Sequence, residues 1–305
     1  MNKLLKFNKK AFSLIELSIV ILIIGILVAG VTQSSRLVRQ IRLATASQMT
    51  RSSEISTIKD LVFWAETSLE NSLVNTAGGF SFDENSPIQT WNDNNPQSTL
   101  KINVSQATSA YQPLYKNSGI NGLPSLSFNG GQLLLSQVGS VPLPANDKNY
   151  TFVIVWRANT VNAGNGQILM SQDAQSAVLN VLASFYITPG GVYGFAGNNN
   201  DITNVGVVAN KDYISIITVN NNVANNISIY TNSNTAVNGN TSGAGGNFSN
   251  LSLGNYNFGF GARIQYAQFY SGLISEAIVV DRIINAEEIK VVNNYLSKKY
   301  AIKIS

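Results

Sequence analysis

The segment from Phe12 to Val31 is a predominantly apolar run in which Glu16 is the sole charged side chain. Its twenty residues form an α-helix about 30 Å long, which matches the hydrocarbon core of a bilayer. A secretory signal peptide is the alternative, but its apolar region usually spans about 7–15 residues and ends at a small-residue cleavage site. Here the small residue Ala11 precedes the run, so the sequence favours a membrane-spanning helix.

The positive charge of the chain is concentrated before this run. The formal net charge is +4, and four lysines precede Phe12 with no acid among them, which leaves the rest of the chain balanced. The positive-inside tendency therefore predicts that residues 1–11 are cytoplasmic and that the chain after Arg36 is exported. Because the basicity concerns topology, we expect no nucleic-acid partner.

The residues around the start of the run carry a family resemblance. Ala11-Phe12-Ser13-Leu14-Ile15-Glu16 resembles the processing site of type IV prepilins and of the pseudopilins of type II secretion. The resemblance implies that a prepilin peptidase cuts between Ala11 and Phe12 and that the new Phe12 amine is methylated. Two positions depart from the family pattern: Ala11 replaces the usual glycine, and Gln33 stands where the family commonly has a helix-kinking proline.

Glu16 requires an explanation, because a carboxylate in lipid costs roughly 2.5–3.5 kcal/mol on insertion scales. The resemblance implies that Glu16 pairs with the Phe12 amine of a neighbouring subunit, so that the cost is recovered during assembly and the charge sets the docking register. The competing interpretation is that Glu16 snorkels to its own cytoplasmic interface.

Beyond the apolar run the helical pattern becomes amphipathic and then weakens. Leu37, Val38, Ile41 and Ala44 recur at helical spacing, and the polar stretch from residue 47 to 56 follows. We therefore predict three regions: a leader peptide at 1–11, a transmembrane and assembly helix at 12–57, and a globular domain at 58–305.

The globular region reads as short β-strands separated by Gly, Asn and Pro. Residues 150–157 alternate with Tyr150, Phe152, Ile154 and Trp156 on one face, and both faces are largely apolar. Further strands are expected at 60–65, 126–128, 132–135, 167–171, 177–187, 192–196, 213–219, 226–230, 256–261 and 272–280. Asn285 followed by Glu287 and Glu288 predicts the N-terminus of one further helix. The fold class is therefore α+β: a long N-terminal helix, an antiparallel β-sandwich and a short C-terminal helix.

Several stretches of this region resemble the concanavalin A-like, laminin-G-like jelly-roll domains of bacterial surface proteins. The matching stretches are Leu61–Glu66, Trp91–Asp93, Gln112–Tyr115, Asn121–Gly130 and Gly272–Tyr300. The resemblance covers residues 58–304 and implies a jelly-roll sandwich of a kind that often binds glycans or other surface ligands, sometimes with calcium.

Composition excludes several kinds of chemistry. The chain has no cysteine and no histidine, which rules out disulfides, thiol nucleophiles, Ser-His-Asp triads and the usual zinc sites. A glycosidase would need two carboxylates about 5–9 Å apart in a groove, and no acidic strand pair of that kind is expected. The sequence therefore predicts that the protein is not an enzyme.

Candidate ligand-binding residues are few. Trp91, Tyr193 and Tyr256 are candidates for stacking on a ligand, and core packing is the competing interpretation for strand aromatics. Calcium needs six to eight oxygens, and Asp93 and Asp201 lie in asparagine-rich stretches, although such residues more often cap their own turns. We expect no cofactor, with calcium as the single alternative.

These observations predict a minor, low-copy pilin or pseudopilin of a type IV pilus or type II secretion filament that displays a jelly-roll head. Its partners are other pilin subunits, the prepilin peptidase and the inner membrane, which it crosses before assembly into a filament in the periplasm or at the cell surface. The alternative is an adhesin module that binds a glycan or another surface ligand and is carried on a pilus.

Overall fold

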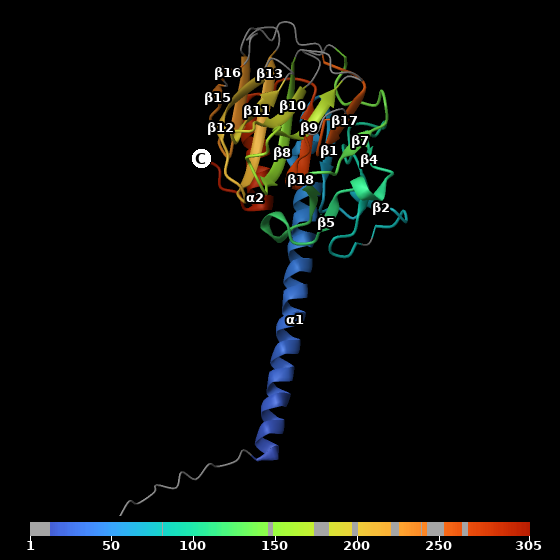
Figure 1. The fold of residues 1–305 in the computed structure, drawn as a ribbon, viewed down its shortest axis with the longest axis vertical. Helices are drawn as coiled ribbons and strands as arrows, with labels where there is room; N and C mark the ends of the chain where they lie inside the picture. Colours follow the sequence, from blue (N-terminus) through green and yellow to red (C-terminus); the bar gives the residue numbers. More distant parts are fainter. Residues whose placement is uncertain are drawn as a thin grey trace, which may run out of the picture. The chain divides into compact units, whose positions relative to one another are not determined.

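The computed structural model describes residues 13–80, 82–145, 149–173, 183–196, 201–220, 226–238, 240–242, 253–263 and 268–305. The chain divides into two compact units, residues 1–42 and residues 43–305. Helix α1 (Leu14–Arg51) contributes to both units (Figure 1). The predicted boundary between the assembly helix and the globular domain, after residue 57, stays a prediction. The second compact unit begins earlier, at residue 43, and includes the last turns of α1.

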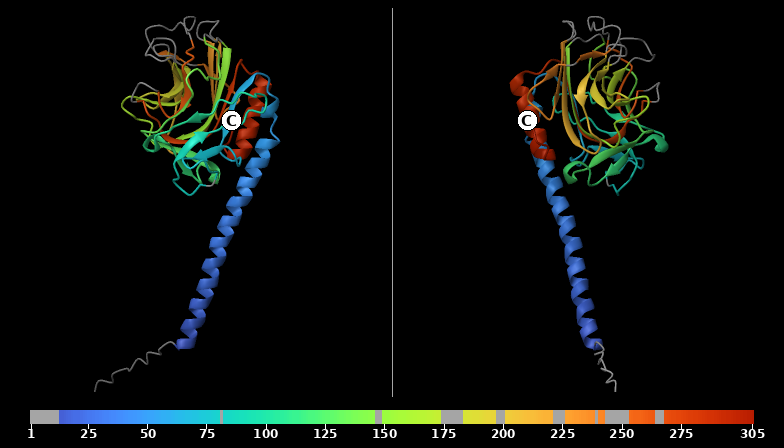
Figure 2. Two further views of the ribbon diagram at one scale, coloured as in Figure 1. Left: turned by 90° about the vertical axis from the view of Figure 1, so that its right-hand side faces the viewer. Right: turned by 60° about the vertical axis from the view of Figure 1, so that its left-hand side comes forward.

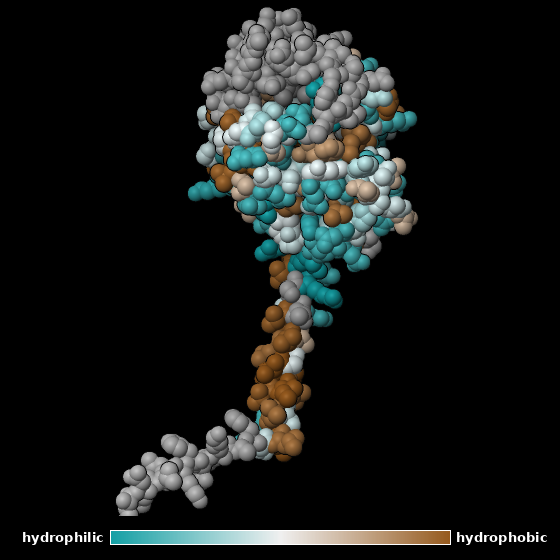
Figure 3. Space-filling model, in the orientation of Figure 1, coloured by the Kyte–Doolittle hydropathy of each residue, from teal (hydrophilic) through white to brown (hydrophobic). Residues whose placement is uncertain are grey.

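Helix α1 is continuous through Gly25, Gly30 and Gln33. In the part of α1 that belongs to the first compact unit, the large apolar side chains are exposed, from Leu14 at 84% to Val31 at 69%. Figure 3 shows apolar residues along this part of the helix. By length and composition α1 can cross a membrane, as the sequence predicts.

The strands of the described residues form two antiparallel sheets. The eight-stranded sheet contains β1 (Leu61–Glu66), β5 (Leu114–Lys116), β6 (Ser125–Asn129), β8 (Asn149–Ala158), β13 (Asp212–Asn220), β14 (Asn226–Thr231), β15 (Val237–Asn238) and β18 (Ser271–Val280). The ten-stranded sheet contains β2 (Leu73–Asn75), β3 (Ile88–Trp91), β4 (Val104–Ser105), β7 (Leu134–Ser136), β9 (Gln167–Asp173), β10 (Ala183–Ile187), β11 (Val192–Ala196), β12 (Asp201–Gly206), β16 (Asn240–Ser242) and β17 (Asn257–Phe260). Three short 3-10 helices are η1 (Glu54–Thr57), η2 (Ser109–Tyr111) and η3 (Ile120–Gly122).

Strand order follows β15-β14-β13-β8-β18-β6-β5 in the eight-stranded sheet, with β1 also paired to β18. The other sheet runs β16-β12-β11-β10-β9-β17-β7-β4-β3-β2. Strand β8 pairs with β13 on one side and β18 on the other, so it is central, as its two apolar faces predict.

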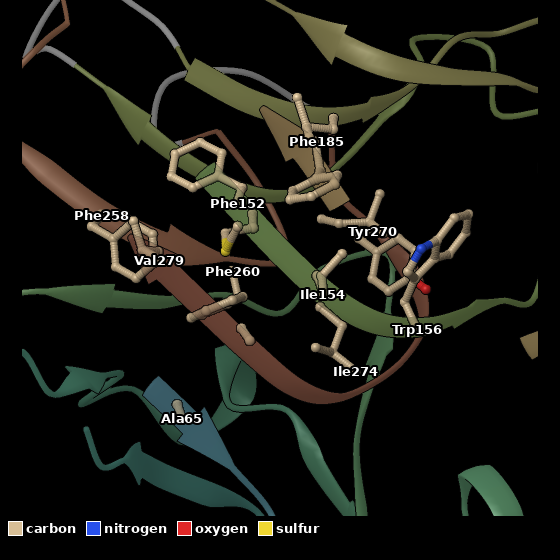
Figure 4. Packing of buried hydrophobic residues seen from close by; sticks show 14 of the residues in the cluster. Ala65, Phe152, Ile154, Trp156, Phe185, Phe258, Phe260, Tyr270, Ile274 and Val279 are labelled. Atoms are coloured by element: carbon tan, nitrogen blue, oxygen red, sulfur yellow. The ribbon is translucent and has the colours of Figure 1, made fainter. Parts of the chain in front are cut away.

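The core between the two sheets is rich in aromatic residues. Phe152, Ile154 and Trp156 project into it from β8, and Phe185, Phe258 and Phe260 meet them from the facing sheet (Figure 4). The rings of Phe63 and Phe258 lie 4.9 Å apart in an edge-to-face arrangement, which is a favourable aromatic geometry. The alternation of β8 therefore predicts the inner face correctly.

The other face of β8 is covered by helices. Val153 and Val155 of β8 belong to a second apolar cluster with Ile289 and Leu296 of α2 (Ala286–Tyr300). The end of α1 adds Ala46 to the same cluster, and α2 lies on the outer side of the sandwich (Figure 2). Both faces of β8 are thus buried.

Helix α2 begins where the sequence predicts. The Asn285 side chain accepts hydrogen bonds from the amides of Glu287 and Glu288, and the Glu288 carboxylate accepts one from the Asn285 amide. This reciprocal capping box satisfies backbone donors that the helix itself leaves unpaired. The predicted fold class, with its long helix, antiparallel sandwich and short C-terminal helix, is confirmed.

Candidate functional site

The first described turn of α1 uses Glu16 as a local hydrogen-bond acceptor. The Ser13 amide donates to Oε2 of Glu16 at 2.9 Å, and the Ile15 amide donates to Oγ of Ser13 at 3.4 Å. The Glu16 side chain thus makes one of the two bonds of a capping box, and the positive end of the helix dipole also favours a carboxylate there. The processing residues Ala11 and Phe12 lie outside the described residues.

A second site, which the sequence did not reveal, is a buried ionic cluster around Lys299. We define the Lys299 cluster as Lys299, Glu66, Glu276, Thr50, Tyr295 and Tyr300. The ammonium of Lys299 donates to Oε2 of Glu66, Oε2 of Glu276 and Oγ1 of Thr50, each at 2.8 Å. The side chains of the lysine and both glutamates are at most 1% exposed. An ammonium has three protons to donate, and all three are used.

The Glu66 carboxylate is held as an anion by its other partners. Its oxygens accept hydrogen bonds from the amides of Ser68 at 2.7 Å and Leu69 at 2.5 Å, from the Ser72 hydroxyl at 2.7 Å and from the Ser68 hydroxyl. Burial alone would raise the pKa of Glu66, but the charge of Lys299 and these hydrogen bonds bring it below its usual value of 4.5. Glu66 is therefore an ionised buried group.

Glu276 is satisfied in the same way by aromatic donors. Its Oε1 accepts from Nε1 of Trp64 at 2.8 Å and from the Tyr295 hydroxyl at 2.9 Å, while Oε2 accepts from the Tyr300 hydroxyl at 2.9 Å. Burial by itself would lower the pKa of Lys299, but the charges of Glu276 and Glu66 hold that pKa well above its usual value. The cluster contains two carboxylates and one ammonium. Hydrogen bonds from neutral donors stabilise the negative charge that the ammonium does not balance.

The Lys299 cluster joins the end of α1 to the sandwich within the second compact unit. Thr50 of α1 contacts both Lys299 and the Tyr295 hydroxyl, and the Ser47 hydroxyl donates to the Ser68 carbonyl at 2.6 Å. A buried ion pair needs close geometry and full hydrogen bonding to offset desolvation, and this cluster has both. The last turns of α1 are therefore anchored by polar contacts as well as by packing.

The structure reveals an acidic strand pair, although not the open, glycosidase-like pair considered from the sequence. Strands β1 and β18 place Glu66 directly opposite Glu276 in antiparallel register. Both carboxylates are closed to solvent, and both bind the same ammonium. The pair therefore lacks the open groove that glycoside hydrolysis requires.

Two of the predicted stacking residues are core residues. Trp91 is fully buried, packs 4.9 Å from the Phe260 ring and donates Nε1 to the Glu66 carbonyl at 2.8 Å. Tyr193 is also fully buried between Phe185 and Trp156. Neither ring presents a face to solvent, so the structure corrects the prediction that they stack on a ligand.

The candidate calcium residue Asp93 caps backbone instead. Its Oδ1 accepts from the amides of Trp64 at 3.1 Å and Asn95 at 2.9 Å, and Oδ2 accepts from the Ile102 amide at 3.2 Å. Burial raises the pKa of Asp93 even though these hydrogen bonds act in the opposite direction. The carboxylate is thus committed to the chain itself, as the competing interpretation predicts. Asp201 lies in β12, and its side chain is outside the described residues.

Tyr256 alone of the three stacking candidates reaches the surface. It is half-buried and lines a polar groove with a volume of about 760 Å³ beside β4, β7 and β17. Sequence reasoning named Tyr256 but not the groove, because the strands that form it are far apart in the chain.

Comparisons with known proteins gave separate matches for the N-terminal segment and for the sandwich. The prokaryotic N-terminal methylation motif matches residues 6–32, which gives the chain a prepilin-type or pseudopilin-type N-terminal segment. No curated protein is similar in sequence to the chain.

Solved structures resemble the sandwich. An arabinofuranosidase complexed with arabinofuranosyl-α-1,2-xylobiose has a TM-score of 0.58 at 13% identity, over 81% of this chain and 64% of that one. A mutant α-L-arabinofuranosidase soaked with 4-nitrophenyl α-L-arabinofuranoside has a TM-score of 0.55 at 14% identity, over 82% and 65%. A Trypanosoma rangeli sialidase in complex with sialic acid has a TM-score of 0.49 at 15% identity, and this chain covers 34% of its length. The two arabinofuranosidase likenesses show the β-sandwich fold, joined here to a prepilin-type segment.

Proposed function

We propose that this chain is a minor pilin or pseudopilin of a type IV pilus or type II secretion filament. The observation that carries the proposal is the exposed apolar surface of α1, which lies within the methylation motif at residues 6–32 and contains Glu16 as its one charge up to Val31. Burying each large aliphatic side chain is worth roughly 1.5–3 kcal/mol, so this surface requires lipid or neighbouring subunits. A pilin buries this surface in lipid while it is in the membrane and against neighbouring subunits once it is in the filament.

The large head favours a low-copy position. The second compact unit spans residues 43–305, and the family resemblance implies smaller heads in major pilins. Before assembly the chain crosses the inner membrane with residues 1–11 in the cytoplasm, because the lysines precede the apolar run. After cleavage the helix enters the filament and the head is displayed outside the membrane.

We also propose that the head is not enzymatic. Strands β1 and β18 bring Glu66 and Glu276 together, and both carboxylates are enclosed with Lys299. Display of a binding surface is the second candidate function of the head, and the polar groove at Tyr256 favours it.

Processing is tested by replacing Ala11 with Trp. A bulky residue at the cleavage position should leave an uncut, inner-membrane form with the leader attached, detected by a mass shift on immunoblots of membrane fractions. Leu4→Trp, which places the same bulky residue elsewhere in the leader, serves as the control and should be cut normally. Normal cutting of the Ala11 variant would count against the assignment.

A further inference from the structure

Three arginines lie on α1 just beyond its apolar run. Arg36, Arg39 and Arg42 are exposed in the first compact unit, and Figure 3 shows hydrophilic residues on α1 beyond its apolar part. Each step of three residues turns an α-helix by about 300°, so the three side chains stay within an arc of about 120°. We call these three residues the arginine stripe.

The arginine stripe has no acid near it in the sequence. Between Glu16 and Glu54 the charged residues are the three of the stripe and Arg51. The salt bridges of the described residues all lie in the second compact unit. Residues three apart are neighbours on a helix surface, so the stripe arginines repel one another unless an anion lies beside them.

A polar turn separates the apolar run from the stripe. Residues 32–35 read Thr-Gln-Ser-Ser, and the Ser34 hydroxyl donates to the Gly30 carbonyl at 2.8 Å. That bond satisfies the hydroxyl within the helix at the edge of the apolar run. The change from apolar to polar residues after Val31 therefore sets the depth of the stripe relative to a membrane.

The stripe lies at the depth of the lipid headgroups. At about 1.5 Å per residue, the backbone of Arg36 is about 7.5 Å and that of Arg39 about 12 Å along the helix from Val31. The headgroup layer on each side of the hydrocarbon core is about 5–7.5 Å thick. Side chains on a helix lean towards its N-terminus, and the long arginine stem carries the charge away from the backbone. The guanidinium groups of Arg36 and Arg39 therefore reach the headgroup layer.

A phospholipid phosphate suits the stripe better than a neighbouring helix does. A second copy of α1 in register has no acid at this height, since residues 17–53 contain none. A guanidinium presents a planar fork of N–H donors that binds phosphate through two parallel hydrogen bonds. Leu37 and Ile41 are exposed on the opposite side of the helix, so the stripe does not occupy the apolar face that neighbouring subunits can contact.

We infer that Arg36 and Arg39 bind the phosphates of anionic phospholipids in the leaflet where α1 leaves the membrane, an inference that rests on the membrane stage of the proposed function. Arg42 lies one turn further along and adds a weaker attraction that salt screens. Each arginine near an anionic lipid surface strengthens binding about fivefold. These contacts hold α1 at a fixed depth and are lost when the subunit leaves the membrane for the filament.

The test measures which lipids surround this part of α1 in the full-length protein. Because the chain has no cysteine, Gln33→Cys provides a single site for a fluorophore, and the protein is placed at one copy per lipid nanodisc. Quenching by spin-labelled phosphatidylglycerol and by spin-labelled phosphatidylcholine gives the relative association constant of the anionic lipid. We expect a preference of about fivefold or more for phosphatidylglycerol.

Substitutions within the stripe should reduce this preference. Arg36→Gln and Arg39→Gln should each weaken it several-fold, and replacing all three stripe arginines with Gln should remove it. Arg51→Gln is the matched control, because it removes the same charge from an exposed position of α1 that lies far beyond the headgroup layer. The preference of this control should equal that of the wild type.

Three results would overturn the inference: no preference for phosphatidylglycerol in the wild type, an equal loss with Arg51→Gln, or an unchanged preference when all three stripe arginines are replaced. If the third result comes with reduced filament incorporation, the stripe binds acidic side chains of a neighbouring subunit instead. Circular dichroism and tryptophan fluorescence of each variant separate loss of lipid binding from loss of folding.

Leader cleavage of the same variants distinguishes this inference from the proposed function. Cleavage should proceed at the wild-type rate in every stripe variant, because the stripe lies far from the cleavage position. Normal cleavage without a lipid preference rejects the stripe inference alone. A lipid preference with an uncut leader rejects the pilin assignment alone.

Discussion

Replacing Lys299 with methionine should strongly destabilise the head. Methionine keeps much of the volume of the lysine stem but removes the charge, so two buried carboxylates lose their shared cation. Removing one partner of a buried ion pair typically costs about 3–5 kcal/mol, because the remaining charge stays desolvated. For a unit of this size that loss corresponds to a fall in Tm of roughly 6–20 °C.

Tryptophan fluorescence during urea unfolding of the full-length protein in detergent measures this loss. The three tryptophans, Trp64, Trp91 and Trp156, are all buried in the head. The fluorescence therefore reports unfolding of the head and not of the apolar part of α1. Lys298→Met is the matched control, since Lys298 is exposed in the same turn of α2 and should change stability by less than about 0.5 kcal/mol.

The pH dependence provides a second readout. In the wild type the pKa of Glu66 is lower in the folded than in the unfolded state, so its contribution is present above pH 4.5 and is lost as the pH falls through the folded pKa. In the Lys299→Met variant burial remains without the cation, and the pKa of Glu66 should rise above 4.5. The folded variant then binds a proton as the pH falls, so its stability deficit should shrink between pH 7 and pH 5.

A neutral version of the cluster completes the experiment. Adding Glu66→Gln and Glu276→Gln to Lys299→Met removes all three charges, and the triple variant should be more stable than Lys299→Met alone. The reasoning is refuted if Lys299→Met costs no more than Lys298→Met, or if its deficit is constant with pH.

Three further changes have defined outcomes. Glu16→Gln should leave leader cleavage at the wild-type rate but reduce filament incorporation several-fold, as measured by the amount of the protein in sheared filaments, and equal incorporation would contradict the docking role. Asn285→Ala removes the two side-chain bonds that cap α2 and should cost about 0.5–2 kcal/mol in urea unfolding, whereas no loss would deny the cap a role. Gly259→Ala places a Cβ 2.1 Å from the Leu134 carbonyl oxygen and should lower the free energy of unfolding by at least about 1–3 kcal/mol. Gly131→Ala, with open space around it, is the control and should be neutral, and equal stabilities of the two variants would refute the close approach.

Elements with a long internal pattern could be predicted from the sequence. The twenty-residue apolar run predicts α1, the alternation over residues 150–157 predicts β8, and the acids after Asn285 predict the start of α2. Strands β2 to β5 were missed because each has two to four residues, which is too short to show a period of two. Their positions depend on partners elsewhere in the sheet.

Trp91 shows how local polarity misleads. Asn92 and Asp93 follow it, so the sequence resembles an exposed loop. In the structure the Asp93 carboxylate accepts hydrogen bonds from three backbone amides and is buried, and the Trp91 indole beside it is fully buried as well. Polar neighbours therefore indicate a surface position only when their hydrogen bonds go to water.

The Lys299 cluster could not be predicted because its members are far apart in sequence, with Glu66 and Lys299 separated by 233 positions. A partial signal was nonetheless present: Glu66 ends an apolar strand, and Glu276 lies within another. A carboxylate inside a central strand needs a cation and several donors, because desolvation is otherwise prohibitive. The sequence supplies the donors near each glutamate, with serines after Glu66 and tyrosines beside Lys299, but only the packing of α2 on the sheet brings the cation to both.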